Sequence, residues 1–378
     1  MGANGLTRTN LRRLQLQMRD SATRQSSRDL IPAPVISSSS PYNTDYLQLI
    51  LASKVYDVVE PTPLTKAGYL SSQLECNVLL KREEVLPKST YKLRGIYNKM
   101  AHMDDAERWR GVIACSTGND ALAVAFSARK LRMPSIIVLP LGAPAAKLQH
   151  LYRLGSTVVL HGPDLDAAME ECSRLQLLHE LTYISACDDP YMIAGHGTIG
   201  PEILKQAFIH QVEAIFCPIV CGSLIAGIGI YVKRVAPHVK IIGVQSNYND
   251  VIDTACLVAY KGQHKIEERR SSKHMSEEIV RICTEVVDDI VQVDTDEVLI
   301  ATKEIYEDTR HILESTGAMS VAGLKSWVTS NGLFGSGMDF IAITSEANVD
   351  FLAIPGIVKR AAVAEEDLTV RVDALGRC

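Results

Sequence analysis

The chain has 378 residues, of which 47% are hydrophobic and 22% charged, and its formal net charge is −5. This length suffices for two domains or one large α/β unit, and the proportions of hydrophobic and charged residues are those of an ordinary globular protein. The acidic net charge argues against nucleic acid as a main partner, and no apolar run reaches the length of a membrane span.

The first forty or so residues are basic and rich in serine. Six arginines stand against two aspartates, and the segment finishes in serines 37–40. Two interpretations remain open, because this composition is typical of a mitochondrial transit peptide and also of a disordered tail. We therefore expect residues 1–41 to be a tail or a transit peptide, and a cytoplasmic location with mitochondrial import as the alternative.

From about Tyr42 onward, apolar strands alternate with amphipathic helices. The expected strands are 112–115, 136–139, 157–160, 182–185, 214–220, 240–244, 286–293 and 340–344, and the expected helices are 144–154, 165–181, 198–207, 224–235, 295–312 and 318–328. Continuous apolar strands between helices predict parallel sheets that are covered on both faces. The charged run 261–273 breaks this alternation and is expected to be a surface loop.

Lys92 lies between a turn signal, Leu86-Pro87, and an amphipathic helix that starts at about Leu93. The unpaired N–H groups at a helix start favour anions and disfavour an ammonium group. A partly desolvated lysine placed there loses its proton readily and can act as an imine-forming nucleophile. Taken alone, a lysine in a first helical turn is more often a solvated charge.

Three polar strand ends are candidate ligand sites, because ligands bind beyond the carboxyl ends of strands in such sheets. They are residues 115–120, 220–227 and 344–348. The first offers hydroxyl and amide groups to a carboxylate or phenolate, and the second starts a helix whose N–H groups suit a phosphate. A nicotinamide site at the second is excluded, because its glycine spacing is wrong.

The nine cysteines are scattered, with no Cys-x-x-Cys pair and no His/Cys cluster. The closest pair, Cys217 and Cys221, lies in a strand-and-loop run. Neither a zinc site nor a disulfide framework is predicted, and the cysteines are interpreted as reduced thiols of an intracellular protein.

Together and in this order, the motifs resemble the threonine dehydratase/serine racemase group of fold type II pyridoxal-phosphate (PLP) enzymes. The resemblance runs from about Asp45 to Asp350, through residues 60–64, 80–84, the Lys92 and Asn119 segments, 188–191, 195–200, 224–227, 314–318 and 345–348. It implies an α/β, tryptophan synthase β-like fold with two parallel-sheet, three-layer domains. The implied domains are a large PLP domain of 42–108 plus 192–360, an inserted small domain of 109–191, and a C-terminal tail of 361–378 with no regulatory domain. Homodimers are usual in such families, so a second copy and a small amino-acid substrate are the expected partners.

The resemblance also implies roles at matching positions. Lys92 would be the catalytic residue, forming the internal Schiff base and shuttling the α-proton. The cofactor-binding residues would be Lys92, Tyr91, Asn119, Cys221, Gly222, Ser223, Leu224 and Ser345, and the substrate-binding residues would be Ser116, Thr117, Gly118 and Asp120. No metal site is expected, because Gln245 stands where racemase-like members place a metal-binding glutamate.

The chain departs from the family pattern at three places. Only Gly222 remains of the glycine run in the phosphate loop, Asp120 stands where a histidine is usual, and Glu346 replaces a glycine beside Ser345. At ~4 Å and an effective dielectric near 20, Asp120 would repel a substrate carboxylate by on the order of 4 kcal/mol. Glu346 is able to approach the ring nitrogen of the cofactor.

Two classes of function follow. The first is a PLP-dependent ammonia-lyase that eliminates water from L-threonine, L-serine or a modified derivative to give a 2-oxo acid and ammonia, as a diverged member of a biosynthetic pathway. The alternative is a relative with weak or no PLP binding that acts as a non-PLP catalyst or binding protein. The retained Lys92, Asn119 and Ser345 favour the enzyme.

Overall fold

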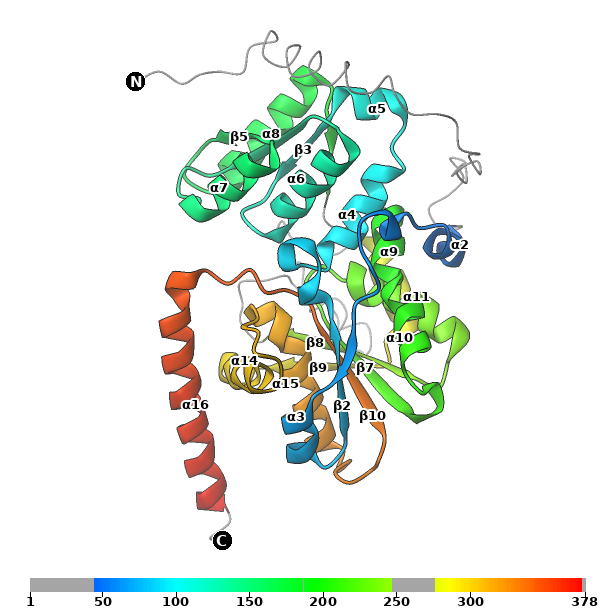
Figure 1. The fold of residues 1–378 in the computed structure, drawn as a ribbon, viewed down its shortest axis with the longest axis vertical. Helices are drawn as coiled ribbons and strands as arrows, with labels where there is room; N and C mark the ends of the chain where they lie inside the picture. The colour runs from blue at the N-terminus through cyan, green and yellow to red at the C-terminus, as the bar shows by residue number, and fades with distance from the viewer. Residues whose placement is uncertain (1–43, 186, 247–275, 376–378) are drawn as a thin grey trace. The chain divides into compact units, whose positions relative to one another are not determined.

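The computed structural model describes residues 44–185, 187–246 and 276–375. The predictions for residues 1–41 and for the charged run 261–273 lie outside the described residues. Within the described part of the chain, residues 44 and 96–185 form one compact unit, and residues 45–95, 187–246 and 276–375 form the other (Figure 1). None of the helices in these described ranges has both the length and the apolar character needed to cross a membrane.

The larger unit is built on a six-stranded sheet. In spatial order its strands are β1 (Leu64–Lys66), β2 (Asn77–Arg82), β10 (Asp339–Thr344), β7 (Val212–Pro218), β8 (Lys240–Ser246) and β9 (Asp289–Val293). All neighbours run parallel except β1, which pairs antiparallel with β2. Strand β1 was not predicted from the sequence, and it pairs antiparallel because residues 67–76 are too few for the crossover that a parallel pair needs.

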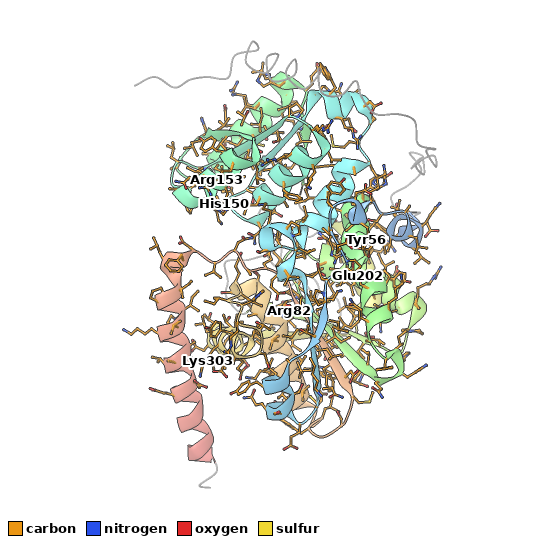
Figure 2. All side chains as sticks on the ribbon, viewed as in Figure 1. Tyr56, Arg82, His150, Arg153, Glu202 and Lys303 are labelled. Carbon is orange, nitrogen blue, oxygen red and sulfur yellow. The ribbon has the colours of Figure 1, made fainter. Side chains whose placement is uncertain are left out.

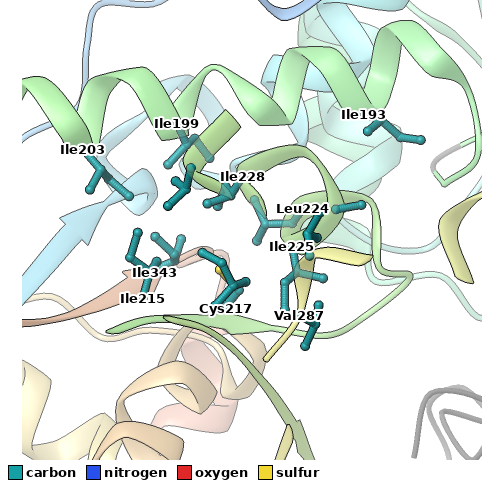
Figure 3. Close-up of a cluster of buried hydrophobic side chains, with 14 of the residues drawn as sticks. Ile193, Ile199, Ile203, Ile215, Cys217, Leu224, Ile225, Ile228, Val287 and Ile343 are labelled. Atoms are coloured by element: carbon teal, nitrogen blue, oxygen red, sulfur yellow. The ribbon is translucent and has the colours of Figure 1, made fainter. Parts of the chain in front are cut away.

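Helices cover both faces of this sheet. One face of the sheet carries α3 (Gly68–Leu74) and α15 (Ser315–Ser330). The α14 helix (Thr295–Thr309) packs on both of these, and α16 (Ile354–Leu375) packs on α14. The other face carries α2 (Tyr46–Leu51), α9 (Pro190–Gly197), α10 (Ile199–Gln206), α11 (Ser223–Val235) and α13 (Glu277–Val286). Figure 3 shows the second core, where isoleucines of α9, α10 and α11 meet side chains of β7 and β10. A Cβ on Gly227 of α11 would lie 2.4 Å from the carbonyl oxygen of Ile193, so only glycine lets α11 and α9 approach this closely.

Two of these helices differ from the sequence-based expectation. Residues 286–293 were expected to form one strand, but Val286 ends α13 and the strand starts at Asp289. The reason is a buried helical stripe formed by Ile279, Ile282 and Val286, which starts only three residues after the Ser276 cap. Residues 361–375, assigned to a tail, belong to the 22-residue helix α16, which buries Ala361 and Ala364.

The smaller unit contains a four-stranded, fully parallel sheet. Its strands in spatial order are β5 (Thr157–Leu160), β4 (Ser135–Leu139), β3 (Val112–Cys115) and β6 (Thr182–Tyr183), and its helices are α5 (Asp105–Arg110), α6 (Asn119–Leu131), α7 (Ala145–Leu154) and α8 (Leu165–His179). The central strands β3 and β4 are buried along their whole length, because α8 packs on one face while α6 contacts the same strands. The α4 helix (Lys92–Ala101) crosses the boundary between the two units.

Candidate active site

Lys92 is the first residue of α4, as the sequence predicts, and it follows a constrained turn. Lys88 and Ser89 both adopt left-handed backbone conformations, with φ values of 66° and 49°, which are costly for residues with a Cβ. The turn is held by the segment after β10: the Tyr91 N–H donates to the carbonyl of Ser345 at 3.1 Å, and the Ala347 N–H donates to that of Ser89 at 3.0 Å. These bonds bring Lys92 and Ser345 together although the two residues are far apart in the chain.

The carboxylate of Glu346 faces Lys92. Its Oε1 lies 3.8 Å from Lys92 Nζ and accepts a hydrogen bond of 2.7 Å from the Thr90 hydroxyl, while Oε2 accepts one of 3.1 Å from Thr316. The Ser345 hydroxyl donates to the carbonyl of Thr316 at 3.2 Å. Thr90 and Thr316 were not predicted from the sequence as site residues. The sequence contained a signal for them, because a carboxylate such as Glu346 at the end of a buried strand requires hydrogen-bond donors nearby.

A buried ion cluster anchors the start of α4. Arg94 is 0% exposed, and its guanidinium donates to Glu83 at 2.7 and 2.9 Å and to Glu202 at 2.6 and 3.0 Å. Lys81 donates to Glu202 at 2.7 Å, and the Tyr56 hydroxyl donates to the same carboxylate at 2.9 Å (Figure 2). Two cations therefore balance two anions. Although burial opposes the charged form, Glu83 and Glu202 raise the pKa of Arg94 further, so it stays charged.

The loop between β7 and α11 has the geometry of an anion site. Gly222 precedes the first helical residue with a φ of 84°, and it offers no side chain to cap α11. The N–H groups of a first helical turn without a side-chain cap are suited to a phosphate. The hydroxyl of Ser223 lies 3.3 Å from the thiol of Cys221, and both Ser223 and Leu224 are buried. Glycine is retained at the one position of the loop where the backbone requires a left-handed conformation.

Two titratable groups close to Lys92 have displaced pKa values. A hydrogen bond from Cys187, opposed by burial and reinforced by Ser223 and by the charge of Lys92, lowers the pKa of Cys221 to about 7. His196 of α9 is 1% exposed, and its ring centroid lies 5.0 Å from that of Tyr91. Burial, followed by the charges of Lys92 and Arg94, lowers the pKa of His196 to about 3. The imidazole is therefore neutral at physiological pH.

The proposed substrate-binding residues form their own group in the smaller unit. They occupy the loop from β3 to α6, where the Gly118 N–H donates to the Ser116 hydroxyl at 3.0 Å and that hydroxyl donates to Asp120 at 3.4 Å. Asn119, the first residue of α6, is buried. Lys147 of α7 donates to the carbonyl of Thr117 at 2.6 Å. This lysine, which brings a positive charge to the loop that carries Asp120, was not predicted from the sequence.

The prediction that the chain has no metal site was based on Gln245. This residue lies near the end of β8 and is 4% exposed. It lines a cavity of about 250 Å³ together with Thr316, Met319 and Arg360. In the three described ranges, no group of three or more His, Cys, Asp or Glu side chains is arranged to hold a metal ion.

Comparison with known proteins assigns the family. The sequence profile described as "Pyridoxal-phosphate dependent enzyme" matches residues 55–339. The chain belongs to this family. It is 47% identical over 325 residues to the threonine dehydratase-like protein AKTS1-1 of Alternaria alternata, which covers 85% of this chain and 80% of the relative. It is 43% identical over 333 residues to the mitochondrial threonine dehydratase of Saccharomyces cerevisiae, covering 85% of this chain and 57% of the yeast protein.

A solved structure gives the same assignment at the level of the fold. The processed form of threonine deaminase isoform 2 from Solanum lycopersicum superimposes with a TM-score of 0.78 at 34% identity, covering 84% of this chain and 88% of that chain. The expected fold type II architecture and the threonine dehydratase-like relationship are confirmed. The chain spans little more than half the length of the yeast dehydratase it matches.

The residues present fit the family's cofactor, pyridoxal 5′-phosphate. The start of α11 offers donors for its phosphate without a competing side-chain cap, and Lys92 begins α4 beside the hydroxyl-bearing Ser345 segment. Both features lie within the larger unit. The N–H groups suit a ligand with a phosphate ester, and the amine of Lys92 suits a ligand with a reactive carbonyl group.

Proposed function

We propose that this chain catalyses the PLP-dependent elimination of water from a 3-hydroxy amino acid, giving a 2-oxo acid and ammonia. The proposed substrates are L-threonine, L-serine or a derivative with a modified carboxyl group. The observation that carries the proposal is the position of Lys92, at the start of α4 and hydrogen-bonded through its turn to Ser345. The names of the relatives, a threonine dehydratase-like protein, a threonine dehydratase and a threonine deaminase, support the choice of substrate.

Each residue has a proposed task. When bound, PLP supplies an electron-withdrawing ring that acidifies the α-hydrogen of an amino acid. Lys92 Nζ holds the cofactor and then accepts and returns the α-proton. The N–H groups of residues 221–224 would bind the phosphate, and the hydroxyl of Ser345 would be the partner of the pyridine nitrogen. We assign to Asn119 the ring hydroxyl, and to Ser116, Thr117 and Gly118 the substrate carboxylate.

The visible absorbance spectrum of the purified protein, with and without added PLP, tests the proposal. We expect the wild type to show an absorbance band of the imine between Lys92 and PLP, and we expect Lys92→Ala to lack this band. Lys99→Ala is the matched control, because Lys99 lies in the last turn of the same helix. Release of ammonia and a 2-oxo acid from threonine or serine would then identify the reaction. If excess PLP produces no band, the dehydratase proposal fails and a relative that has lost the cofactor is favoured.

We further propose that the chain forms a homodimer, and that its two units correspond to the large PLP domain and the inserted small domain. The location is proposed to be cytoplasmic. Mitochondrial import is the alternative, because two yeast relatives are named as mitochondrial. Light scattering after size-exclusion chromatography tests the dimer. Fusing residues 1–41 to a fluorescent protein tests import.

A further inference from the structure

Three cysteines surround the loop that precedes α11. The thiols of Cys221 in the loop and of Cys187 before α9 share a hydrogen bond, and Cys221 also lies 3.3 Å from the hydroxyl of Ser223. Cys283 of α13 approaches from the core, where its thiol donates to the carbonyl of Gly222 at 3.9 Å. Cys187 and Cys221 are half-buried, whereas Cys283 is fully buried.

The three thiols differ in reactivity. With a pKa of about 7, Cys221 is a thiolate in a large fraction of molecules at neutral pH, and the thiolate is the reactive form. Burial, together with the charge of Cys221, raises the pKa of Cys283 to about 12, so Cys283 remains a thiol. The groups that face Cys221 are Cys187, Ser223, Lys92 and Cys283, and of these only Lys92 carries a positive charge toward it.

We propose that Cys221 is a reversible oxidation site for hydroperoxides, that Cys187 is its disulfide partner, and that the disulfide impairs binding of the cofactor phosphate. The proposal about the phosphate rests on the proposed function of residues 221–224, whereas the disulfide itself does not. Cys221 stands where the resemblance places a glycine of the phosphate loop.

The chemistry balances with a hydroperoxide as the oxidant. The Cys221 thiolate attacks the terminal peroxide oxygen, so that an S–O bond forms, the O–O bond breaks, and the alcohol or water leaves after gaining a proton. The Cys187 sulfur then attacks Cys221, forming the S–S bond, and the hydroxide leaves as water with the Cys187 proton. In total, two thiols lose two electrons and two protons, and the peroxide is reduced. A dithiol reverses the bond by exchange.

A disulfide would change the loop for a geometric reason. The S–S bond is about 2.05 Å long, much shorter than a thiol–thiol hydrogen bond, so the two sulfur atoms must move closer together. Because Cys221 directly precedes Gly222 and the start of α11, a covalent bond to Cys187 constrains the backbone N–H groups that the proposed function assigns to the phosphate. Conversely, a bound phosphate would place negative charge beside Cys221, disfavour its thiolate and slow oxidation.

The first experiment maps the oxidised thiols. Full-length protein is treated with hydrogen peroxide at neutral pH, alkylated and digested, and the linked peptides are identified by mass spectrometry. A Cys187–Cys221 peptide that dithiothreitol removes is expected. Cys187→Ser should instead leave Cys221 as a sulfenic acid that dimedone labels, and Cys221→Ser should abolish both products. Alkylation of Cys283 in the same digests is the internal control. If the peroxide links other cysteines, or leaves Cys221 unmodified, the proposal is wrong.

The second experiment titrates PLP into reduced and oxidised protein and follows the change in absorbance. Oxidation should weaken PLP binding by at least roughly tenfold, the effect of losing one hydrogen bond to a charged group, and dithiothreitol should restore it. Cys187→Ser, which circular dichroism must show to be folded, should bind PLP normally before peroxide treatment. Equal affinity of oxidised and reduced protein would overturn the proposed effect on phosphate binding. If the reduced protein binds no PLP, the proposed function fails, and the peptide map alone decides whether the oxidation site exists.

Discussion

Lys92 Nζ lies 3.8 Å from the Oε1 atom of Glu346, a carboxylate that is only 3% exposed. Thr90 and Thr316 donate hydrogen bonds to the two oxygens of this carboxylate and so fix its orientation toward the lysine. The family pattern has a glycine at this position, which places no charge near the lysine. The attraction between the two groups is on the order of 4 kcal/mol at ~4 Å and a dielectric near 20.

Glu346→Gln should make Lys92 react faster with PLP. The amide can still accept the hydrogen bond from Thr90, but it no longer holds the ammonium form of the lysine. We expect the rate of band formation at neutral pH to rise by roughly tenfold, which corresponds to about 1.4 kcal/mol. Glu304→Gln is the matched control, because Glu304 is also buried and pairs with a lysine, Lys325, on other helices. Equal rates in wild type and Glu346→Gln would contradict the interpretation.

Asp120→His should improve the use of free threonine. In the smaller unit, Asp120 accepts a hydrogen bond from Ser116, one of the groups assigned to the substrate carboxylate. Removing the charge should lower the KM for free threonine by roughly tenfold with little change in kcat, because like charges repel in the bound state. Asp120→Asn separates the loss of charge from the gain of an imidazole. A KM that neither variant changes would show that Asp120 does not face the substrate carboxylate.

Arg94→Met should destabilise the larger unit. The substitution leaves Glu83 and Glu202 buried with only one nearby cation, Lys81, so the free energy of unfolding should fall by roughly 3–5 kcal/mol. Urea unfolding followed by circular dichroism measures the change. Arg281→Met is the control, since Arg281 is partly exposed and pairs with the exposed Glu285 and the partly buried Glu278, and its loss should cost less than about 1 kcal/mol. Similar losses in the two variants would argue against the buried cluster as a major contribution to stability.

His196 should make the fold sensitive to mild acid. Its pKa is about 3 in the folded protein and near 6.5, the ordinary value for histidine, in the unfolded chain, so between these pH values the unfolded state binds more protons. Its contribution to stability is therefore complete above pH 6.5 and is lost as the pH falls toward 3. At about pH 5 the loss amounts to about 2 kcal/mol.

Comparison with His196→Gln isolates this effect, since glutamine does not titrate in this range. The unfolding free energy of wild type minus that of the variant should decrease by this amount between about pH 7 and 5. A difference that stays constant with pH would mean that His196 has an ordinary pKa in the folded protein.

Much of the fold follows from local sequence pattern. The apolar runs 112–115 and 340–344 are strands, the second extended by Asp339, and Asp294 with Glu297 forms the expected capping box at the start of α14. Lys92 begins its helix where the turn signal places it. These features depend on burial periodicity and capping, which involve residues only a few positions apart. The antiparallel β1 and the extent of α16 were not predicted, because they depend on connection length and on packing against α14.

The sequence by itself determined the alternation of strands and helices, the family resemblance, and the residue types available for catalysis. Only the tertiary structure decided that Glu346 faces Lys92, that Arg94 is balanced by Glu83 and Glu202, and that Cys187 meets Cys221. The physical reason is that these contacts join segments far apart in the chain. The spatial order of strands brings such segments to one edge of the sheet, and that order is set by long-range packing, on which a local pattern carries little information.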